Sequence, residues 1–134
     1  MALQLLRALS QVHNIVMSWA EEPPMPRSRL GELEEQVLLT VLRLGGESYA
    51  VPVARELGRL TARDVSPATA YMVLRRLEGR GLLVSSVGTP APERGGRPRR
   101  FYRVVDEQAL PALRESRNAM LALWDGLEAR LGPS

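Results

Sequence analysis

The segment from Pro92 to Phe101, PERGGRPRRF, gathers four arginines and two glycines in one short stretch. Guanidinium groups bind phosphates and carboxylates through paired, charge-assisted hydrogen bonds. Glycines allow a backbone to approach a phosphate chain closely. An arginine run is as often a plain solvated surface, so its meaning depends on the elements around it.

Positive charge is concentrated near this segment. The chain has 134 residues and a formal net charge of +3, and all of its basic side chains are arginine. Residues 66–105 carry +6, from eight arginines and two glutamates, whereas the segments on either side are close to neutral or negative. Such a local positive charge attracts a polyanion through phosphate neutralisation and counterion release.

Catalytic and metal-binding chemistry has few candidate residues. The chain has no cysteine and one histidine, His13, and its aspartates stand only at positions 64, 106 and 125. These residues offer no nucleophile–base pair and no metal-ligand cluster. Gly95-Gly96 follows a proline-rich loop and not a strand that opens into a helix, so it is no phosphate-binding fingerprint. We expect neither an enzyme nor a cofactor or metal.

Apolar spacing predicts the helices. One amphipathic helix is expected over residues 2–20, followed by a proline-rich linker, and further helices over 31–44, 51–60 and 107–131. Another helix is expected to start with Ser66 as N-cap and Pro67 in the first turn, and to end at Gly81. The residues predicted to face the core are Leu33, Val37, Leu38, Val41 and Leu42, then Val53, Ala54, Leu57 and Leu60, then Ala70, Val73, Leu74 and Leu77.

Two short strands, at 82–87 and 101–105, are predicted to form a hairpin with an arginine-rich tip of about thirteen residues. Three helices followed by a hairpin is the order of a winged helix-turn-helix. In that fold a recognition helix fits the major groove, and the hairpin reaches phosphates or the neighbouring minor groove. Both contact surfaces would come from the segment that carries +6.

The same elements resemble the PadR family of transcriptional regulators over about residues 29–125. The resemblance lies in Ser66-Pro67-Ala68-Thr69-Ala70-Tyr71, in Arg76-Leu77-Glu78 with Gly81-Leu82-Leu83, and in Gly95-Gly96 followed by Phe101-Tyr102. A weaker match is Glu47-Ser48-Tyr49-Ala50, where Ala50 replaces a common glycine. The resemblance implies a homodimeric DNA-binding repressor of the short branch, with one C-terminal helix making most of the dimer.

The predicted fold is thus mostly α with a small β-hairpin, a winged helix-turn-helix plus a C-terminal dimerisation helix. The expected parts are an N-terminal extension (1–24), a linker (25–30), the winged helix-turn-helix domain (31–105) and the dimerisation helix (106–134). The extension is either an accessory dimerisation helix or the result of a misplaced start, since Met25 is a natural first residue. Its apolar stretch is too interrupted for a membrane span or a signal peptide, so we expect a cytoplasmic protein.

Two sets of residues follow from the predicted fold and the resemblance. The set expected to contact double-stranded DNA is Tyr49, Ser66, Thr69, Tyr71, Arg75, Arg94, Arg97, Arg99 and Arg100. The set expected to form the dimer seam, which has coiled-coil-like spacing, is Leu110, Leu113, Met120, Trp124, Leu127 and Leu131.

Several of these roles have alternatives. Tyr71 could instead be a partly buried ring at a helix edge, and the neighbouring Arg76 could form an ion pair with Glu78 or Glu56. Trp124 would line a pocket for a planar ligand if the helix pairs across a dimer, although the sequence identifies no inducer.

We therefore expect a sequence-specific transcriptional regulator, a repressor that binds an inverted-repeat operator as a homodimer. The alternative from another class is a winged-helix protein-interaction module whose basic wing docks an acidic partner. In that case the wing would meet no DNA. Neither alternative involves a membrane.

Overall fold

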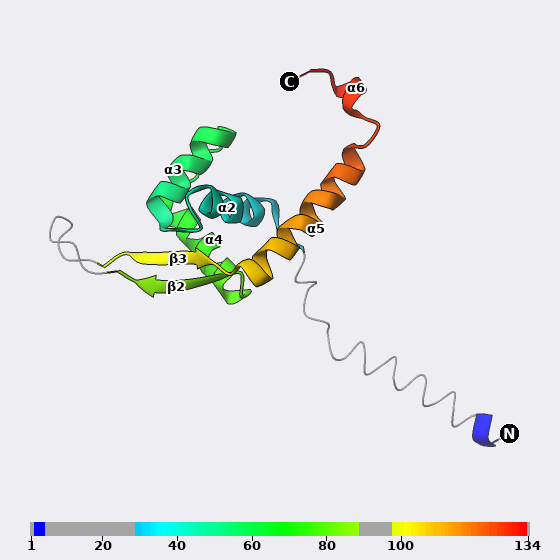
Figure 1. Cartoon of the computed structure of the whole chain (residues 1–134), viewed down its shortest axis with the longest axis horizontal. Helices are drawn as coiled ribbons and strands as arrows, with labels where there is room; N and C mark the ends of the chain where they lie inside the picture. The colour runs from blue at the N-terminus through cyan, green and yellow to red at the C-terminus, as the bar shows by residue number, and fades with distance from the viewer. Residues whose placement is uncertain (1, 5–28, 89–97, 134) are drawn as a thin grey trace.

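The computed structural model describes residues 2–4, 29–88 and 98–133 (Figure 1). Most of the helix predicted over 2–20, the linker up to residue 28 and the tip of the wing with Arg94 and Arg97 lie outside the described residues. In the described part of the chain, no helix is both long enough and apolar enough to cross a bilayer.

The described elements follow the order of a winged helix-turn-helix. They are α2 (Glu32–Arg43), β1 (Glu47–Ser48), α3 (Ala50–Thr61), α4 (Pro67–Gly79), β2 (Leu83–Val87), β3 (Arg100–Val104), α5 (Asp106–Trp124) and α6 (Glu128–Leu131). The strands form an antiparallel sheet in the order β1-β3-β2. Figure 1 shows α2, α3 and α4 grouped beside this sheet, with α5 leading away from it. The predicted fold is confirmed.

The sheet contains one strand more than the predicted hairpin. Strands β2 and β3 pair from Leu83 opposite Val104 to Val87 opposite Arg100, which confirms the hairpin. The additional strand, β1, pairs Glu47 with Arg103 and Ser48 with Tyr102. A strand of two residues is too short to show the alternation of apolar and polar residues that identifies a strand in a sequence.

Local signals set the limits of α4, the predicted recognition helix. The Ser66 hydroxyl accepts a hydrogen bond from the backbone N–H of Thr69 at 3.1 Å, and Pro67 occupies the first turn. Both features were predicted. The helix ends at Gly79, and Gly81 follows with a φ of +79°, a conformation that favours glycine.

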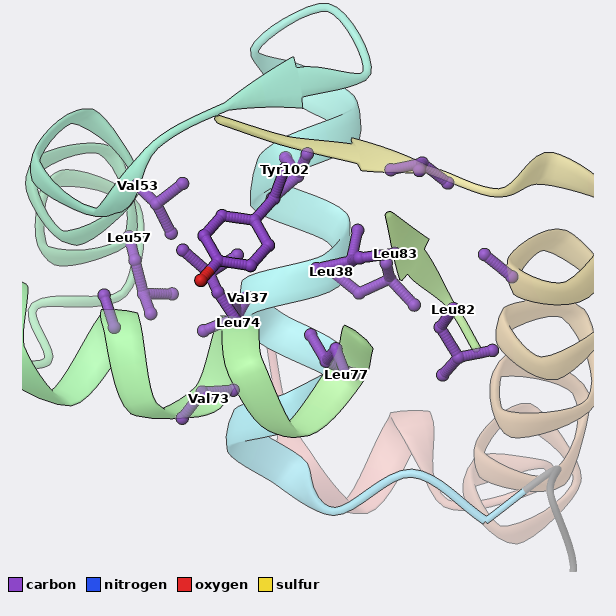
Figure 2. Packing of buried hydrophobic residues seen from close by; sticks show 14 of the residues in the cluster. Val37, Leu38, Val53, Leu57, Val73, Leu74, Leu77, Leu82, Leu83 and Tyr102 are labelled. Carbon is purple, nitrogen blue, oxygen red and sulfur yellow. The ribbon is translucent and has the colours of Figure 1, made fainter. Parts of the chain in front are cut away.

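The inner face of α4 lies at the centre of the hydrophobic core. Its predicted stripe, Ala70, Val73, Leu74 and Leu77, is between 0 and 3% exposed. Figure 2 shows Tyr102 of β3 entering the space between α4, α2 and α3. The start of the wing is therefore attached to the same core as the recognition helix.

The predicted stripes of α2 and α3 are also confirmed, with one exception. Val37, Leu38 and Val41 of α2 and Val53 and Leu57 of α3 are buried. Leu60 was expected to face the core, but 44% of its surface is exposed. It belongs to the last turn of α3, which extends past the helices that cover the earlier turns (Figure 1).

A largely buried ion pair joins the end of α4 to the start of α2. Arg80 Nη1 lies 2.9 Å from Glu34 Oε2, and Arg80 Nη2 donates to the carbonyl of Arg29 at 2.9 Å. The second oxygen of Glu34 accepts from the backbone N–H of Gly31 at 3.0 Å. Because both charges have partners, the pair fixes how α2 enters the domain.

The prediction of one continuous C-terminal helix over 107–131 is wrong. Helix α5 ends at Trp124, and α6 begins only at Glu128. Between them Asp125 is extended and Gly126 has a φ of +79°. A glycine in this left-handed conformation interrupts the helical hydrogen bonds, so the expected dimerisation region consists of two helices.

Ala62 provides a test of backbone strain. It follows α3 with a φ of +56°, a left-handed backbone conformation that is unfavourable for a residue with a Cβ. Its N–H donates to the carbonyl of Gly58. Ala62→Gly removes this strain and should raise the free energy of unfolding by about 0.5–1 kcal/mol. Urea denaturation followed by circular dichroism, at one protein concentration, measures the change.

The matched control is Ala119→Gly, at an exposed position within α5. Glycine in a helix interior should lower the free energy of unfolding by roughly 0.5–1 kcal/mol. Equal losses in the two variants would contradict the strain at Ala62.

Candidate nucleic-acid interface

The face of α4 opposite the core stripe is open to solvent. It combines hydrogen-bonding, apolar and cationic side chains, which suits contact with both base edges and phosphates. Thr69 lies at its start, where the Ser66 hydroxyl donates to the Thr69 hydroxyl at 3.0 Å. The exposed residues of this face are Ala68, Thr69, Tyr71, Met72, Arg75 and Arg76.

Tyr71 lies at the junction of α4 and the wing. Its ring packs edge-to-face against Tyr102, with 6.5 Å between the ring centroids, and the guanidinium of Arg75 lies 5.9 Å from its centroid. Tyr71 is nevertheless 37% exposed. Tyr71 therefore has both predicted features, a packed ring and a solvent-facing surface.

Arg76 does not form either of the ion pairs considered from the sequence. Glu56 pairs with Arg59 of the same helix, and this hydrogen bond holds the pKa of Glu56 below its usual value. Glu78 accepts a hydrogen bond from Ser85. Arg76 is exposed and forms no ion pair with the described residues.

The first arginine of the wing base, Arg99, stacks on Tyr49. Its guanidinium carbon lies 4.1 Å from the centroid of the Tyr49 ring. The same ring packs edge-to-face against Phe101, with 5.4 Å between centroids. Tyr49, predicted as a DNA contact, thus meets the wing at the N-cap of α3.

The second arginine, Arg100, is connected to α4. Its Nη1 donates to the Ser85 hydroxyl at 3.0 Å. Ser85 in turn donates to the Glu78 carboxylate in α4. This chain of contacts links the returning strand of the wing to the recognition helix. Ser85, Glu78 and Phe101 were not among the predicted site residues.

Of the predicted DNA contacts, the structure therefore brings together two neighbouring groups. One group lies on or at the start of α4, and the other lies where the wing leaves the sheet. Arg103, further along β3, is exposed and stands in register between Glu47 and Val84. Arg94 and Arg97 belong to the wing tip, outside the described residues.

The residues of the predicted dimer seam differ in their exposure in the structure. Leu113 is buried within the domain, whereas Leu110, Met120, Trp124, Leu127 and Leu131 are exposed. A groove of about 580 Å³ runs between α2 and α5, with Arg114, Arg117 and Glu35 at its edge. Its apolar lining consists of Leu39, Leu42, Leu110, Leu113, Met120, Leu121 and Trp124.

Among the described ranges, no three His, Cys, Asp or Glu residues gather into a cluster that could hold a metal ion. The described residues instead form an exposed recognition-helix face, an arginine-bearing wing base and an apolar C-terminal surface. This combination is characteristic of regulators that bind nucleic acids.

Comparison with known proteins identifies the family of this chain. The profile of the Transcriptional regulator PadR-like family matches residues 38–107, from within α2 to the start of α5. The chain belongs to the PadR-like family. The resemblance seen in the sequence is confirmed, and membership places the chain among DNA-binding transcriptional regulators.

Individual relatives of this PadR-like chain are also named as transcriptional regulators. A PadR family transcriptional regulator from Eggerthella lenta has a crystal structure that matches with a TM-score of 0.57 at 28% identity, covering 93% of this chain and 99% of that one. The transcriptional activator GvpE2 of Halobacterium salinarum is 34% identical over 80 residues, which cover 60% of this chain and 37% of that protein. The chain thus matches little more than a third of that curated relative.

A more distant structure shares the fold alone. The organohalide-sensing regulator RdhR in its 2,4-dichlorophenol-bound form matches with a TM-score of 0.53 at 17% identity, covering 95% of this chain and 69% of that one.

Tyr102, which supports Tyr71, gives a prediction about pH. It is fully buried, its hydroxyl has no hydrogen-bond partner among the described residues, and burial raises its pKa to about 12. The folded state therefore holds this proton more tightly than the unfolded chain, whose tyrosine pKa is about 10. Stability should be complete below pH ~10 and fall as the pH rises from ~10 to ~12.

Tyr102→Phe should abolish most of this fall and should not destabilise the protein at pH 7, because an unpaired buried hydroxyl contributes nothing. Urea denaturation at several pH values measures both effects. The chain has no lysine or cysteine whose titration would overlap with that of tyrosine in the alkaline range. Tyr49 and Tyr71 remain in the variant, so any fall in stability that they cause appears in both proteins. A loss above pH 10 of equal size in both proteins would contradict the assignment.

Proposed function

We propose that this PadR-like protein represses transcription by binding an inverted-repeat operator as a homodimer. The observation that carries the proposal is the direct linkage of the open face of α4 to the arginines of the wing base. Tyr71 packs on Tyr102, and Glu78 connects through Ser85 to Arg100. One rigid surface can then enter a major groove and reach the adjoining backbone.

Each predicted contact except Tyr49 binds DNA directly in this proposal. Thr69 and Arg75 face base edges or phosphates in the major groove, while Ser66 and Tyr71 bind phosphate beside it. Arg99 and Arg100 bind phosphates at the wing base. Arg94 and Arg97, in the tip, extend the same contact toward the minor groove.

The homodimer rests on the exposed apolar surface of α5 and α6. Met120 and Trp124 lie along one side of α5, and Leu127 and Leu131 continue the surface beyond it. Covering such a surface with a second copy removes it from water. A two-fold axis would place two α4 helices about one helical turn of DNA apart, roughly 10 bp or a multiple.

Repression follows from occupancy of promoter DNA and needs no catalysis. Release would require a ligand that binds better to a dimer with wrongly spaced α4 helices. The apolar groove containing Trp124 suits a small planar inducer, and RdhR, which shares the fold, was crystallised with 2,4-dichlorophenol. GvpE2 is named an activator, so transcription from the bound promoter in vitro decides the direction of control.

Duplex binding at increasing salt tests the DNA contacts. Each arginine that neutralises a phosphate should contribute about one unit to the slope of log affinity against log salt. We expect Arg99→Ala and Arg100→Ala each to flatten the slope by about one unit. Arg130→Ala in α6, distant from α4 and the wing in Figure 1, should leave it unchanged.

Fluorescence anisotropy with genomic fragments, including the protein's own promoter, measures these affinities. A wild-type protein without duplex affinity at ~50 mM salt would exclude DNA as the ligand. The arginines would then serve the alternative function, docking of an acidic protein partner.

Trp124 tests the dimer. It is 46% exposed in the single chain, so Trp124→Ala should leave the fold intact and weaken association. A buried tryptophan at an interface contributes about 2 kcal/mol or more. Two-fold symmetry counts it twice, about 4 kcal/mol in all, so the dimer Kd should rise on the order of 1000-fold. Sedimentation equilibrium measures the change, and Met72→Ala, an exposed apolar residue of α4, should cause none.

A further inference from the structure

We propose that Tyr49 is a positioning residue for DNA binding: its ring orients the Arg99 guanidinium toward the DNA backbone and does not contact DNA itself. The inference rests on the proposed function, and it refines the role of one residue in the predicted contact set. Tyr49 and Arg99 are far apart in the sequence and meet only where the N-cap of α3 approaches the wing.

The contact between Tyr49 and Arg99 is close, with the guanidinium carbon over the face of the ring. A guanidinium carbon 4.1 Å from the ring centroid lies well within the roughly 6 Å range of cation–π attraction. Stacking leaves the N–H groups at the edge of the guanidinium available for a paired contact with phosphate oxygens. The contact holds Arg99 without neutralising its charge.

Tyr49 is itself held in place. It is half-buried at the N-cap of α3, where its carbonyl accepts a hydrogen bond from the N–H of Val53. Phe101 packs against its ring edge-to-face, with an angle of 68° between the ring planes. Residues two apart in a strand point to the same side, so the chain direction that places Phe101 beside Tyr49 brings Arg99 there as well.

The backbone of Arg99 is fixed from the opposite strand. The N–H of Gly88 donates to the carbonyl of Arg99 at 2.7 Å. The Phe101 ring lies so close to Gly88 that a Cβ at this position would be 2.7 Å from Phe101 Cε2. Glycine at position 88 therefore allows Phe101 to pack against the hairpin and to support Tyr49.

Arg99 is thus restrained at its backbone by Gly88 and at its guanidinium by Tyr49. A long side chain restrained before binding loses less rotamer freedom when it meets its ligand. Removing the Tyr49 ring should leave the charge of Arg99 in place but release its orientation. Affinity should fall, and the fall should depend on the presence of Arg99.

The experiment measures duplex affinity and its salt slope for Tyr49→Leu, Tyr49→Phe, Arg99→Ala and the Tyr49→Leu/Arg99→Ala double variant. We expect Tyr49→Leu to lower affinity about 3- to 10-fold, as for loss of one cation–π contact and the orientation it gives. Tyr49→Phe keeps the ring and should restore wild-type affinity. In the Arg99→Ala background, Tyr49→Leu should have no further effect.

Several outcomes would overturn the proposal while leaving DNA binding established. An equal loss in Tyr49→Phe and Tyr49→Leu would show that the hydroxyl contacts DNA directly. Additive losses in the double variant would show that the two residues act independently, and unchanged binding by Arg99→Ala would remove the residue that Tyr49 is said to orient.

A second variant covers the case in which Tyr49→Leu unfolds the N-cap of α3. Phe101→Leu removes the edge contact that fixes Tyr49, and it should lower affinity in the wild type but not beside Arg99→Ala. Equal losses in both backgrounds would overturn the proposal. Absence of duplex binding by the wild type would instead overturn the proposed function, and this inference with it.

Discussion

Burial of one face of α4 is the constraint on which the rest of the structure depends. Ala70, Val73, Leu74 and Leu77 anchor this helix among α2, α3 and β2, and the anchoring leaves its other face open to solvent. Tyr102 extends the same core into β3, although its hydroxyl lacks a partner among the described residues. The recognition helix and the wing base share one core, so they form a single rigid surface and not two independent parts.

The two arginines at the wing base are held in different ways. They are consecutive in the chain, and consecutive side chains in an extended segment point to opposite sides. Arg99 stacks on an aromatic ring and forms no ion pair with the described residues, whereas Arg100 bonds to a serine that donates to Glu78. In the proposed DNA complex, Arg99 would therefore be the freer of the two to bind phosphate, while Arg100 ties the wing to α4. The wing base is thus held from both sides by described residues of the domain.

Local signals and periodicity predicted the helix-turn-helix and the hairpin. Ser66, Pro67 and the stripe from Ala70 to Leu77 define α4 because caps and helical spacing are properties of neighbouring residues. Contacts between residues far apart in the sequence were missed, because no local pattern encodes them. Arg80 meets Glu34, and Arg99 meets Tyr49, only after the chain has folded. Leu60 shows the opposite error, since periodicity gives the face of a helix but not where its neighbours end. Gly126 was a readable signal for the end of α5, but the apolar spacing that continues through Leu127 and Leu131 concealed it.

The C-terminal region shows why spacing alone could not separate packing within one chain from packing between two. A single repeat runs through Leu113, Met120 and Trp124, but only Leu113 is buried in the domain. The first turns of α5 are supported by the core through Ala109, Ala112 and Leu113, whereas no residue from 114 to 124 is buried. A helix of this length gains most of its stability from a packed apolar face and not from intrinsic propensity. In the proposed homodimer, a second copy would give the distal turns of α5 a surface of matching apolar character, which the described part of one chain does not supply. Because α5 follows directly on β3, such pairing would also set the distance between two wings.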